Sequence, residues 1–454
     1  MIDIQNGIAT RSRPGFPRRD FLRIGAVGLG GLTLANWLNL KAQGAVGGGK
    51  AKSVIQIFSI GGPSQLDLFD PKPDAGRDYT GPFNKTVKTN VPGIVFNATI
   101  PLLAKQADKF SVIRTMTHDT NTHPRGKPLM LSLAPGDMDF PSLGCMVAAK
   151  RAQAGRQELL PPHVTLSQDL PISPKFLPKK YAAVSPDSMD SLPGMTPERQ
   201  EGRRTFLASV DDLARDMDKK GTWETLDSSQ QDAYAVMLGD AKKAFDLSLE
   251  KPEVRSRYNE TTEKLLLAIR LVEHGVPFVS IPGGFPGDAH NLIFDKWAKN
   301  WPLWDAGLSA FFEDMASRGL LDSTIVTWYG EFGRNPKVDW QAPFLGGRGH
   351  WCWCFSALVA GGGFKAGAVV GESDERGAYV KDRPVYPWDL GASIYQLLGF
   401  DPASTVPNPQ AGRPTPISPL FAADGTTTKS EGDWNKVRDK SGKLFSGGIL
   451  KEIM

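Results

Sequence analysis

Carboxylate and imidazole side chains recur at short spacing in the second half of the chain, where its potential for chemistry is most concentrated. Asp288 and His290 are two residues apart. Glu331 follows an apolar run, and His350 lies in a glycine-rich loop. Carboxylate oxygens and imidazole nitrogens bind divalent cations such as Zn²⁺, Ca²⁺, Mg²⁺ and Mn²⁺. These residues therefore predict a metal-assisted hydrolytic site that holds one or two ions.

A second group of polar residues follows the strand that we expect at 111–114. A single histidine is usually structural, but two histidines beside threonines and an arginine at one strand end favour a functional role. The group consists of His118, Thr120, Thr122, His123 and Arg125.

A third polar group follows the first expected strand, at 53–60. Gly61 and Gly62 could let backbone N–H groups approach a ligand closely, with Ser64 and Asp67 within reach of the same crevice. Alternatively, the segment is a tight turn in which Ser64 caps a short helix. The local sequence favours neither reading over the other.

These polar groups, apart from His350, have in common that each directly follows an expected β-strand. Apolar runs rich in β-branched residues are typical of buried parallel strands, and they occur at 53–60, 111–114, 276–281 and 324–329. The carboxyl ends of parallel strands lie along one edge of a sheet, so the polar groups should meet there. The sequence therefore predicts an α/β fold with a mostly parallel central sheet.

The N-terminus is typical of an export signal. Arg18 and Arg19 precede Phe21 and Leu22, and a weakly apolar run rich in glycine and alanine follows. This pattern indicates a twin-arginine signal peptide over residues 1–45, since a membrane span needs about 20 strongly apolar residues. We therefore expect the twin-arginine export machinery as a partner, a periplasmic or secreted location, and no transmembrane span in the mature chain.

Charge and cysteine content narrow the function classes further. The six basic and two acidic residues of the leader account for the whole formal net charge of +4. The balanced remainder predicts no binding to nucleic acid. Cys352 and Cys354 could chelate zinc, but the third cysteine, Cys145, does not complete a four-ligand site, so packing is favoured.

Beyond the leader we expect one large domain at 46–420, whose sheet is interrupted by an insertion of loops and helices at 167–260. The insertion begins with proline-rich loops and continues with helix-start signals and mixed charges, which are typical of a solvated helical layer. Residues 421–454 are polar and are expected to form a loosely attached tail.

Several motifs resemble those of the bacterial domain-of-unknown-function family 1501. The resemblance extends over about residues 18–414, and its most specific part is Gly-Glu-Phe-Gly-Arg at 330–334. The other segments are the paired arginines, 61–72 (Gly-Gly-Pro-Ser-Gln-Leu-Asp-Leu-Phe-Asp-Pro-Lys), the Asp-x-His pair at 288–290, 347–351 (Gly-Arg-Gly-His-Trp), 377–379 and 382–385.

This resemblance implies a three-layer αβα fold like that of the alkaline phosphatase and sulfatase superfamily, and hydrolysis of a phosphate or sulfate ester. In that comparison Asp67 resembles an early metal-binding carboxylate. Asp288, His290 and His350 resemble the ligands of one metal, and Glu331 resembles a second acidic ligand. The nucleophile position falls in the 120–123 loop.

The identity of the attacking group stays open at this point. Ser64, Thr120, Thr122 or His123 could attack, or water activated by a metal ion could do so. The 120–123 loop contains no cysteine from which a formylglycine could form, which disfavours a sulfatase of the usual kind. Arg125 or Arg334 could clamp the anion.

One departure from the family pattern puts activity in question. Gly349 replaces an aspartate that the family commonly has before the histidine of Gly-Arg-Asp-His-Trp. Two functions therefore remain: a metal-dependent hydrolase of small or polymeric anionic esters, and a non-catalytic binding or surface-assembly protein on a degenerate hydrolase fold.

Overall fold

The computed structural model describes residues 49–135, 139–156, 160–185, 243–283, 288–421, 427–428, 437–438 and 443–454, together with the backbone of two short N-terminal strands. The chain divides into two units, Met1–Gly48 and Gly49–Met454. In the first unit, β1 (Ile2–Gln5) and β2 (Ile8–Arg11) pair antiparallel. The twin-arginine motif and most of the expected insertion lie outside the described residues.

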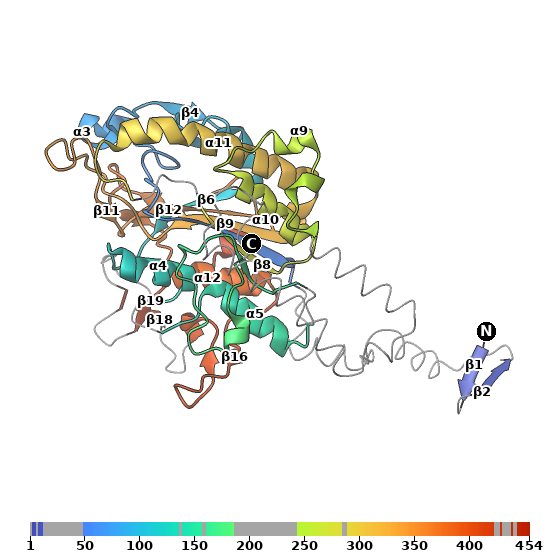
Figure 1. Cartoon of the computed structure of the whole chain (residues 1–454). Helices are drawn as coiled ribbons and strands as arrows, with labels where there is room; N and C mark the ends of the chain where they lie inside the picture. Colours follow the sequence, from blue (N-terminus) through green and yellow to red (C-terminus); the bar gives the residue numbers. More distant parts are fainter. Residues whose placement is uncertain are drawn as a thin grey trace. The chain divides into compact units, whose positions relative to one another are not determined.

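The second unit is built on a seven-stranded sheet (Figure 1). β12 is antiparallel to both of its neighbours, while all the other adjacent pairs are parallel. This arrangement confirms the predicted mostly parallel sheet. In spatial order the strands are β13 (Val369–Val370), β6 (Ser111–Met116), β12 (Phe355–Ala360), β9 (Thr324–Gly330), β3 (Ser53–Ser59), β8 (Phe278–Pro282) and β7 (Val164–Thr165).

The central strand β3 is buried on both faces. Its side chains alternate, so that Ile55 and Ile57 pack into one hydrophobic core and Val54 and Phe58 into the other. A strand that has helices on both faces has no solvated side, and this explains its continuous apolar run.

Helices cover both faces of the sheet, which confirms the predicted three-layer αβα fold. α10 (Glu263–Glu273) and α11 (Ile293–Ser317) pack with the core that contains Ile55. α4 (His123–Ser132), α5 (Leu143–Gln153) and α12 (Pro387–Leu397) pack on the opposite face (Figure 1).

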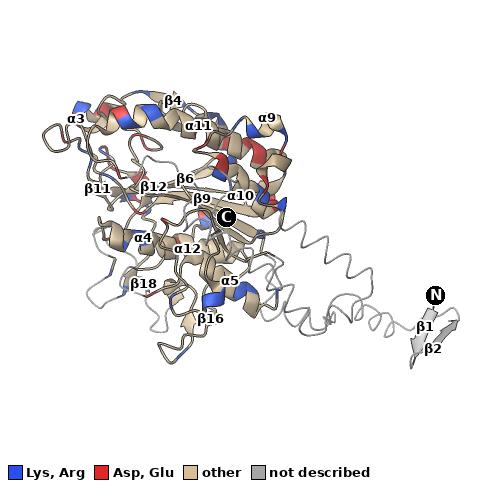
Figure 2. Cartoon of the chain, viewed as in Figure 1, with Lys and Arg blue, Asp and Glu red and all other residues tan. Residues whose placement is uncertain are grey.

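The helix α11 is longer than the sequence pattern suggested. We predicted a helix at 301–318, whereas the structure starts it at Ile293, directly after Leu292 in the left-handed conformation. Trp297 and Trp301 are buried on its inner side, and charges of both signs lie along its outer side (Figure 2). The tryptophans of its first turns explain the difference, because their burial in the hydrophobic core outweighs their modest helix propensity.

The end of the chain also differs from the expected loose tail. Leu450 and Ile453 are buried in the same core as α12, and Leu444 packs with Trp388. The apolar residues among the last twelve positions therefore anchor this segment.

The antiparallel strand β12 brings two distant parts of the chain to one edge of the sheet. β3, β6, β8 and β9 end at this edge, whereas β12 begins there. Residues that precede β12, including His350 in β11 (His350–Trp351), therefore lie at the same edge as residues that follow the parallel strands.

The remaining elements are short. They are η1 (Pro73–Ala75), α3 (Arg77–Thr80), β4 (Thr86–Lys88), β5 (Val95–Asn97), η2 (Leu103–Lys109), η3 (Lys179–Tyr181), η4 (Leu247–Leu249), α9 (Pro252–Arg255), η5 (Leu320–Asp322), β10 (Gly333–Arg334), β14 (Glu372–Ser373), β15 (Val380–Asp382), β16 (Thr405–Val406), β17 (Thr415–Pro416), η6 (Pro419–Phe421), β18 (Thr427–Thr428), β19 (Leu444–Phe445) and η7 (Lys451–Ile453). None of the helices in the described residues has both the length and the apolar composition that a membrane crossing needs.

Candidate metal centre

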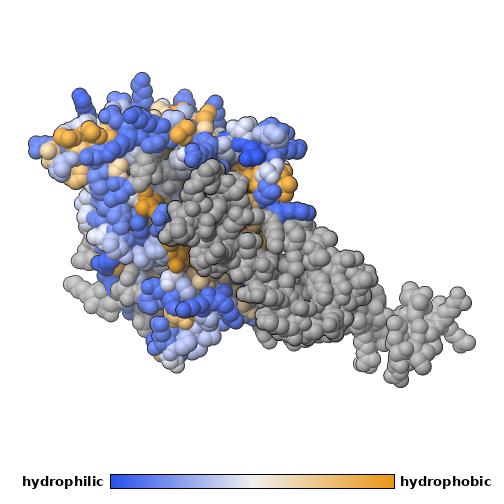
Figure 3. Space-filling model, viewed as in Figure 1, coloured by the Kyte–Doolittle hydropathy of each residue, from blue (hydrophilic) through white to orange (hydrophobic). Residues whose placement is uncertain are grey.

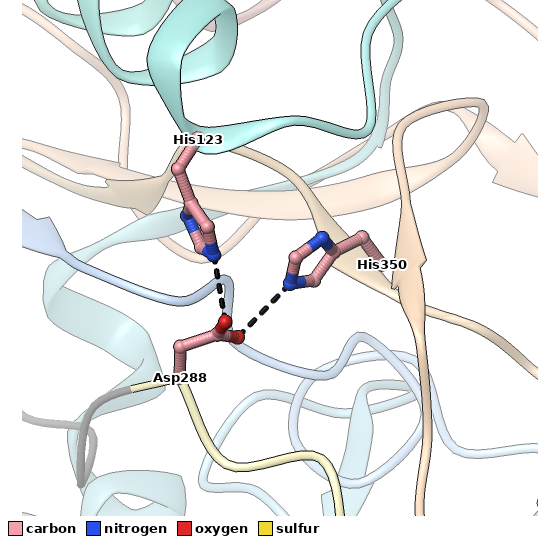
Figure 4. Close-up of side chains that lie close together, drawn as sticks. All are labelled: His123, Asp288 and His350. Carbon is pink, nitrogen blue, oxygen red and sulfur yellow. Dashed lines mark hydrogen bonds and ion pairs between the residues drawn. The ribbon is translucent and has the colours of Figure 1, made fainter.

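The carboxylate of Asp288 is surrounded by three imidazole rings. Nε2 of His123 lies 2.8 Å from its Oδ2, Nε2 of His290 lies 3.0 Å from the same oxygen, and Nε2 of His350 lies 2.9 Å from Oδ1. Figure 4 shows His123 and His350 pointing toward this carboxylate from two different elements. The ligand atoms of His123, Asp288 and His350 lie within 4.8 Å of one another, close enough to bind one metal ion.

Local structure at the edge of the sheet places each of these side chains. His123 is the first residue of α4, where Pro124 with its fixed backbone angle favours the start of a helix. Asp288 and His290 lie between β8 and α11. His350 pairs directly with Arg334 across the short antiparallel β10–β11 ladder.

His350 is held by contacts on both sides of its ring. Nδ1 lies 2.8 Å from the backbone carbonyl oxygen of Asn121, which can only accept a hydrogen bond. Nδ1 of a neutral imidazole must therefore carry the proton, and the Nε2 lone pair is directed at Asp288. Two acceptors face each other at this point unless the ring takes a second proton or a cation lies between them.

His123 repeats this arrangement with a carboxylate as its outer partner. Its Nδ1 lies 2.6 Å from Oε1 of Glu331, and both oxygens of that buried carboxylate accept a hydrogen bond from the backbone N–H of Gly61. A metal-binding histidine typically donates its other N–H to a carboxylate or a backbone carbonyl, which fixes the orientation of the ring. Glu331 therefore contacts the far side of the His123 ring, away from Asp288.

The charges around Asp288 fit a cation better than two extra protons. The ring centroids of His123 and His350 are 4.6 Å apart, and those of His290 and His350 are 4.5 Å apart. Two imidazolium ions at this spacing would repel each other and the nearby guanidinium of Arg334. Although burial opposes the shift, the positive charge of the neighbouring Arg334 helps to hold the pKa of Asp288 well below its usual range.

His290 adds a further imidazole whose second nitrogen is not satisfied. Its Nδ1 is buried and has no hydrogen-bonding partner among the described residues. Burial, followed by the charge of Arg334, lowers the pKa of His290, which favours the neutral form that metal binding requires.

Arg334 orients Asp288 and uses four of its five N–H donors within the protein. Its NH2 group donates to Asp288 Oδ1 at 2.9 Å, while its other nitrogens donate to the carbonyl oxygens of Gly62, Ala289 and Arg348. The side chain is almost completely buried. These contacts fit the positioning of a ligand better than the clamping of a substrate anion, for which the sequence suggested Arg334.

Ser64 and Asp67 belong to a separate buried ion pair. Ser64 Oγ donates to Asp67 Oδ2 at 2.5 Å, and Arg348 Nε lies 2.9 Å from the same oxygen. Burial raises the pKa of Asp67, and Arg348 and Ser64 act against this shift. Of the two readings for this segment, the hydrogen bond favours the turn, and Asp67 fixes the loop that carries His350.

The 118–125 segment contributes supporting contacts as well as the candidate ligand His123. His118 is buried, its Nε2 lies 2.7 Å from the carbonyl oxygen of Glu331, and its Nδ1 accepts from the N–H of Thr120. Thr120 Oγ1 and Thr122 Oγ1 contact each other at 3.2 Å. Arg125 is exposed on α4, and the structure gives it no ion pair within the described part of the chain.

The cysteines take no part in this centre. Cys145, Cys352 and Cys354 are buried and free, and Cys354 donates to the carbonyl oxygen of Arg114 at 3.4 Å. Burial is the main cause that raises the pKa of Cys352 to about 12, so it is a thiol at neutral pH. This environment agrees with the packing role that was favoured over zinc chelation.

Sequence reasoning missed some contributors to the site. The carbonyl oxygen of Asn121 and the N–H of Gly61 are backbone groups, so no pattern of side chains in the sequence predicts their contacts. Phe332, whose ring centroid lies 4.2 Å from that of His350, could have been found because it follows Glu331 in the most specific motif. His123 was predicted as a catalytic residue, whereas its geometry fits a metal ligand.

Residues 51–419 match the family described as protein of unknown function DUF1501. The chain belongs to the DUF1501 family. This match confirms the resemblance found in the motifs, and it covers every strand of the central sheet and all the residues around Asp288. A comparison of this DUF1501 protein with curated proteins gives no match.

Several solved structures resemble this DUF1501 protein at low identity. Ps i-CgsB has a TM-score of 0.40 at 11% identity, with 82% of this chain and 76% of that chain covered. The PsFucS1 sulfatase from Pseudoalteromonas sp. has a TM-score of 0.31 at 13% identity, with 86% and 73% covered. The C-terminal periplasmic domain of EcEptC from Escherichia coli, in complex with Zn, has a TM-score of 0.35 at 12% identity, with 80% and 88% covered. Because these identities and TM-scores are low, function has to be inferred from the geometry of the chain's own residues.

Proposed function

We propose that the protein is an exported, metal-dependent hydrolase of phosphate or sulfate esters. The observation that carries the proposal is the arrangement around Asp288, where His123 and His350 direct Nε2 at the carboxylate while Nδ1 of each ring faces an acceptor. A divalent cation between these atoms would replace two protons and relieve the repulsion between them.

The donor set favours a particular class of metal. Three imidazoles and one carboxylate suit Zn²⁺ or another divalent transition metal, whereas Ca²⁺ and Mg²⁺ prefer oxygen ligands. His123, Asp288 and His350, whose ligand atoms lie within 4.8 Å of one another, would hold the ion, and the neighbouring His290 would be available as a further ligand. When bound, it would polarise the ester oxygen and stabilise charge on the leaving oxygen.

The chain's own residues would prepare the site for this chemistry. Glu331 and the carbonyl of Asn121 fix the His123 and His350 rings, and Arg334 fixes Asp288. Arg125 is the better of the two predicted anion clamps, because it is exposed, whereas Arg334 is buried and uses four of its five N–H donors within the protein.

The attacking group that fits best is water. Among the described residues, no serine or threonine hydroxyl is hydrogen-bonded to Asp288 or to the three histidines around it. Ser64 is buried and donates to Asp67, and Thr120 is buried against Thr122. A covalent intermediate on Ser64 is therefore the least accessible of the predicted alternatives.

Export by the twin-arginine route to the periplasm or the cell exterior is part of the proposal. It is supported by the paired arginines at 18–19 in the sequence. Replacing both arginines with lysine should leave full-length precursor in the cytoplasm, and normal export of that variant would contradict this part.

Hydrolysis can be tested with an aryl phosphate and an aryl sulfate on metal-loaded protein. Asp288→Asn should lower kcat/KM by more than about a hundredfold, because a ligand contributes more than the supporting groups whose loss costs ten- to a hundredfold. The matched control is Asp295→Asn, which changes an exposed carboxylate in the first turn of α11. Absence of hydrolysis of any ester by metal-loaded protein would favour the non-catalytic binding function.

A further inference from the structure

An apolar lip adjoins the candidate metal centre. We define it by Leu292, Trp340, Phe344 and Leu345. Leu292, Trp340 and Leu345 are 46%, 40% and 51% exposed, although large apolar side chains are usually covered. Figure 3 shows hydrophobic surface at the upper left of the molecule, where Figure 1 draws the loop that precedes β11.

The lip is continuous with the centre through His290. The ring centroid of Phe344 lies 5.9 Å from that of His290, and Leu292 follows His290 by two positions. A Cβ atom at Gly347 would lie 1.7 Å from the carbonyl oxygen of His290, so only glycine permits this close packing. The lip therefore adjoins the imidazole of His290, whose Nε2 contacts Asp288.

Backbone hydrogen bonds hold the lip in a fixed shape. Asp339 and Gly347 pair antiparallel and close the loop at its base. The N–H of Leu292 donates to the carbonyl of Phe344 at 3.1 Å, and this joins the loop to the start of α11. The ring of Trp340 stacks on Phe294, with their centroids 6.3 Å apart.

Two leucines of the lip adopt an unfavourable backbone conformation. Leu292 has φ of 48° and Leu345 has φ of 50°, in the left-handed region that residues with a Cβ atom usually avoid. Strained residues of this kind persist when the surroundings fix them, and they cluster at ligand-binding sites. At both positions the residue in this conformation leaves about half of an apolar side chain exposed to solvent.

We infer that the apolar lip binds the hydrocarbon part of the ester substrate, so that the preferred substrate is an ester of a hydrophobic alcohol. The inference rests on the proposed function, because it assigns the group next to the anion at the same site. The continuity with His290, the fixed shape and the exposure of Leu292 and Leu345 carry it.

A homologous series of n-alkylphosphonates, from methyl to hexyl, tests the inference. These compounds have the anionic group of the substrate and are not hydrolysed, so their Kd for metal-loaded protein can be measured by calorimetry. Each methylene that becomes buried should strengthen binding by up to about three- to fourfold. Chain length should therefore lower Kd progressively in the wild-type protein.

Two variants and a control locate the effect. Leu345→Asn and Leu292→Asn should flatten the dependence on chain length and leave the Kd of methylphosphonate unchanged. Asparagine tolerates the left-handed conformation, so both variants should fold. Leu249→Asn is the matched control, because Leu249 is 55% exposed in η4 and lies outside the lip.

The outcomes separate this inference from the proposed function. Binding of methylphosphonate with no dependence on chain length would overturn the inference and leave the proposed function standing. Failure of the whole series to bind metal-loaded protein would overturn both. Dimerisation of the wild-type protein that Leu345→Asn abolishes would assign the lip to a second copy of the chain and overturn the inference.

Discussion

The Nε2 atom of His350 lies 2.9 Å from Oδ1 of Asp288, while Nδ1 of the same ring lies 2.8 Å from the carbonyl oxygen of Asn121. A neutral imidazole has one N–H, so it cannot donate in both directions. His123 has the same arrangement between Asp288 and Glu331. Two rings in this arrangement support the proposal of a cation at this centre.

Glu331 should control metal affinity through His123. In Glu331→Gln the amide oxygen can still accept from His123 Nδ1, but the ring loses a charged partner that raises its basicity. We expect the Kd for Zn²⁺ to rise ten- to a hundredfold, as measured by competition with a chromophoric chelator. The control Glu372→Gln removes an exposed carboxylate that pairs with Lys381 and should leave the Kd unchanged. Complete loss of metal would instead make Glu331 a ligand.

We expect Asp67 to stabilise the folded protein rather than to bind metal. Asp67→Asn leaves the buried guanidinium of Arg348 without its charged partner, and breaking a buried ion pair typically costs about 3–5 kcal/mol. We expect the free energy of unfolding to fall by that amount in urea titrations, while the folded variant still binds metal. A variant of wild-type stability that has lost its metal would show that Asp67 is a ligand.

The strands and their polar ends could be predicted because each strand is a short apolar run. This pattern predicted that Asp288 and His290 would meet Glu331 and the 118–123 segment, and His123 contacts both carboxylates in the structure. His350 precedes the strand β12, and only the family resemblance implied its place beside Asp288. The antiparallel direction of β12 and the pairing of Asp67 with Arg348, 281 positions away, could not be predicted, since neither leaves a local pattern. The sequence suggested His123 as an attacking group and Glu331 as a metal ligand, whereas the structure fits His123 as the ligand and Glu331 as its support. This assignment depends on which nitrogen of the His123 ring faces which carboxylate, and the sequence carries no signal for that.

His118 should make stability depend on pH. Burial is the main cause that lowers its pKa from 6.5 to about 4 in the folded protein. Between these values the unfolded chain binds a proton that the folded protein does not bind, so stability falls as the pH falls. We expect His118 to account for a loss of about 2 kcal/mol between pH 7 and pH 5. His118→Gln should remove this part of the dependence in denaturant titrations, and parallel profiles for the two proteins would contradict the prediction.

Gly349 offers room for the aspartate that the family motif Gly-Arg-Asp-His-Trp commonly has at this position. No heavy atom lies within 4 Å of a Cβ atom built at this position. We expect Gly349→Asp to change stability by less than about 0.5 kcal/mol and to strengthen metal binding that the wild-type protein already has. Gly349→Asn is the control of equal size without the charge. A wild-type protein that binds no metal, together with a variant that binds it, would favour the non-catalytic function.

Elemental analysis of the purified protein by mass spectrometry tests the central claim most directly. We expect about one equivalent of a divalent transition metal per chain in the wild-type protein and in the Asp295→Asn control, and almost none in Asp288→Asn. A folded wild-type protein that remains metal-free after incubation with Zn²⁺, or an Asp288→Asn variant that keeps its full metal content, would contradict the assignment of a metal centre at Asp288.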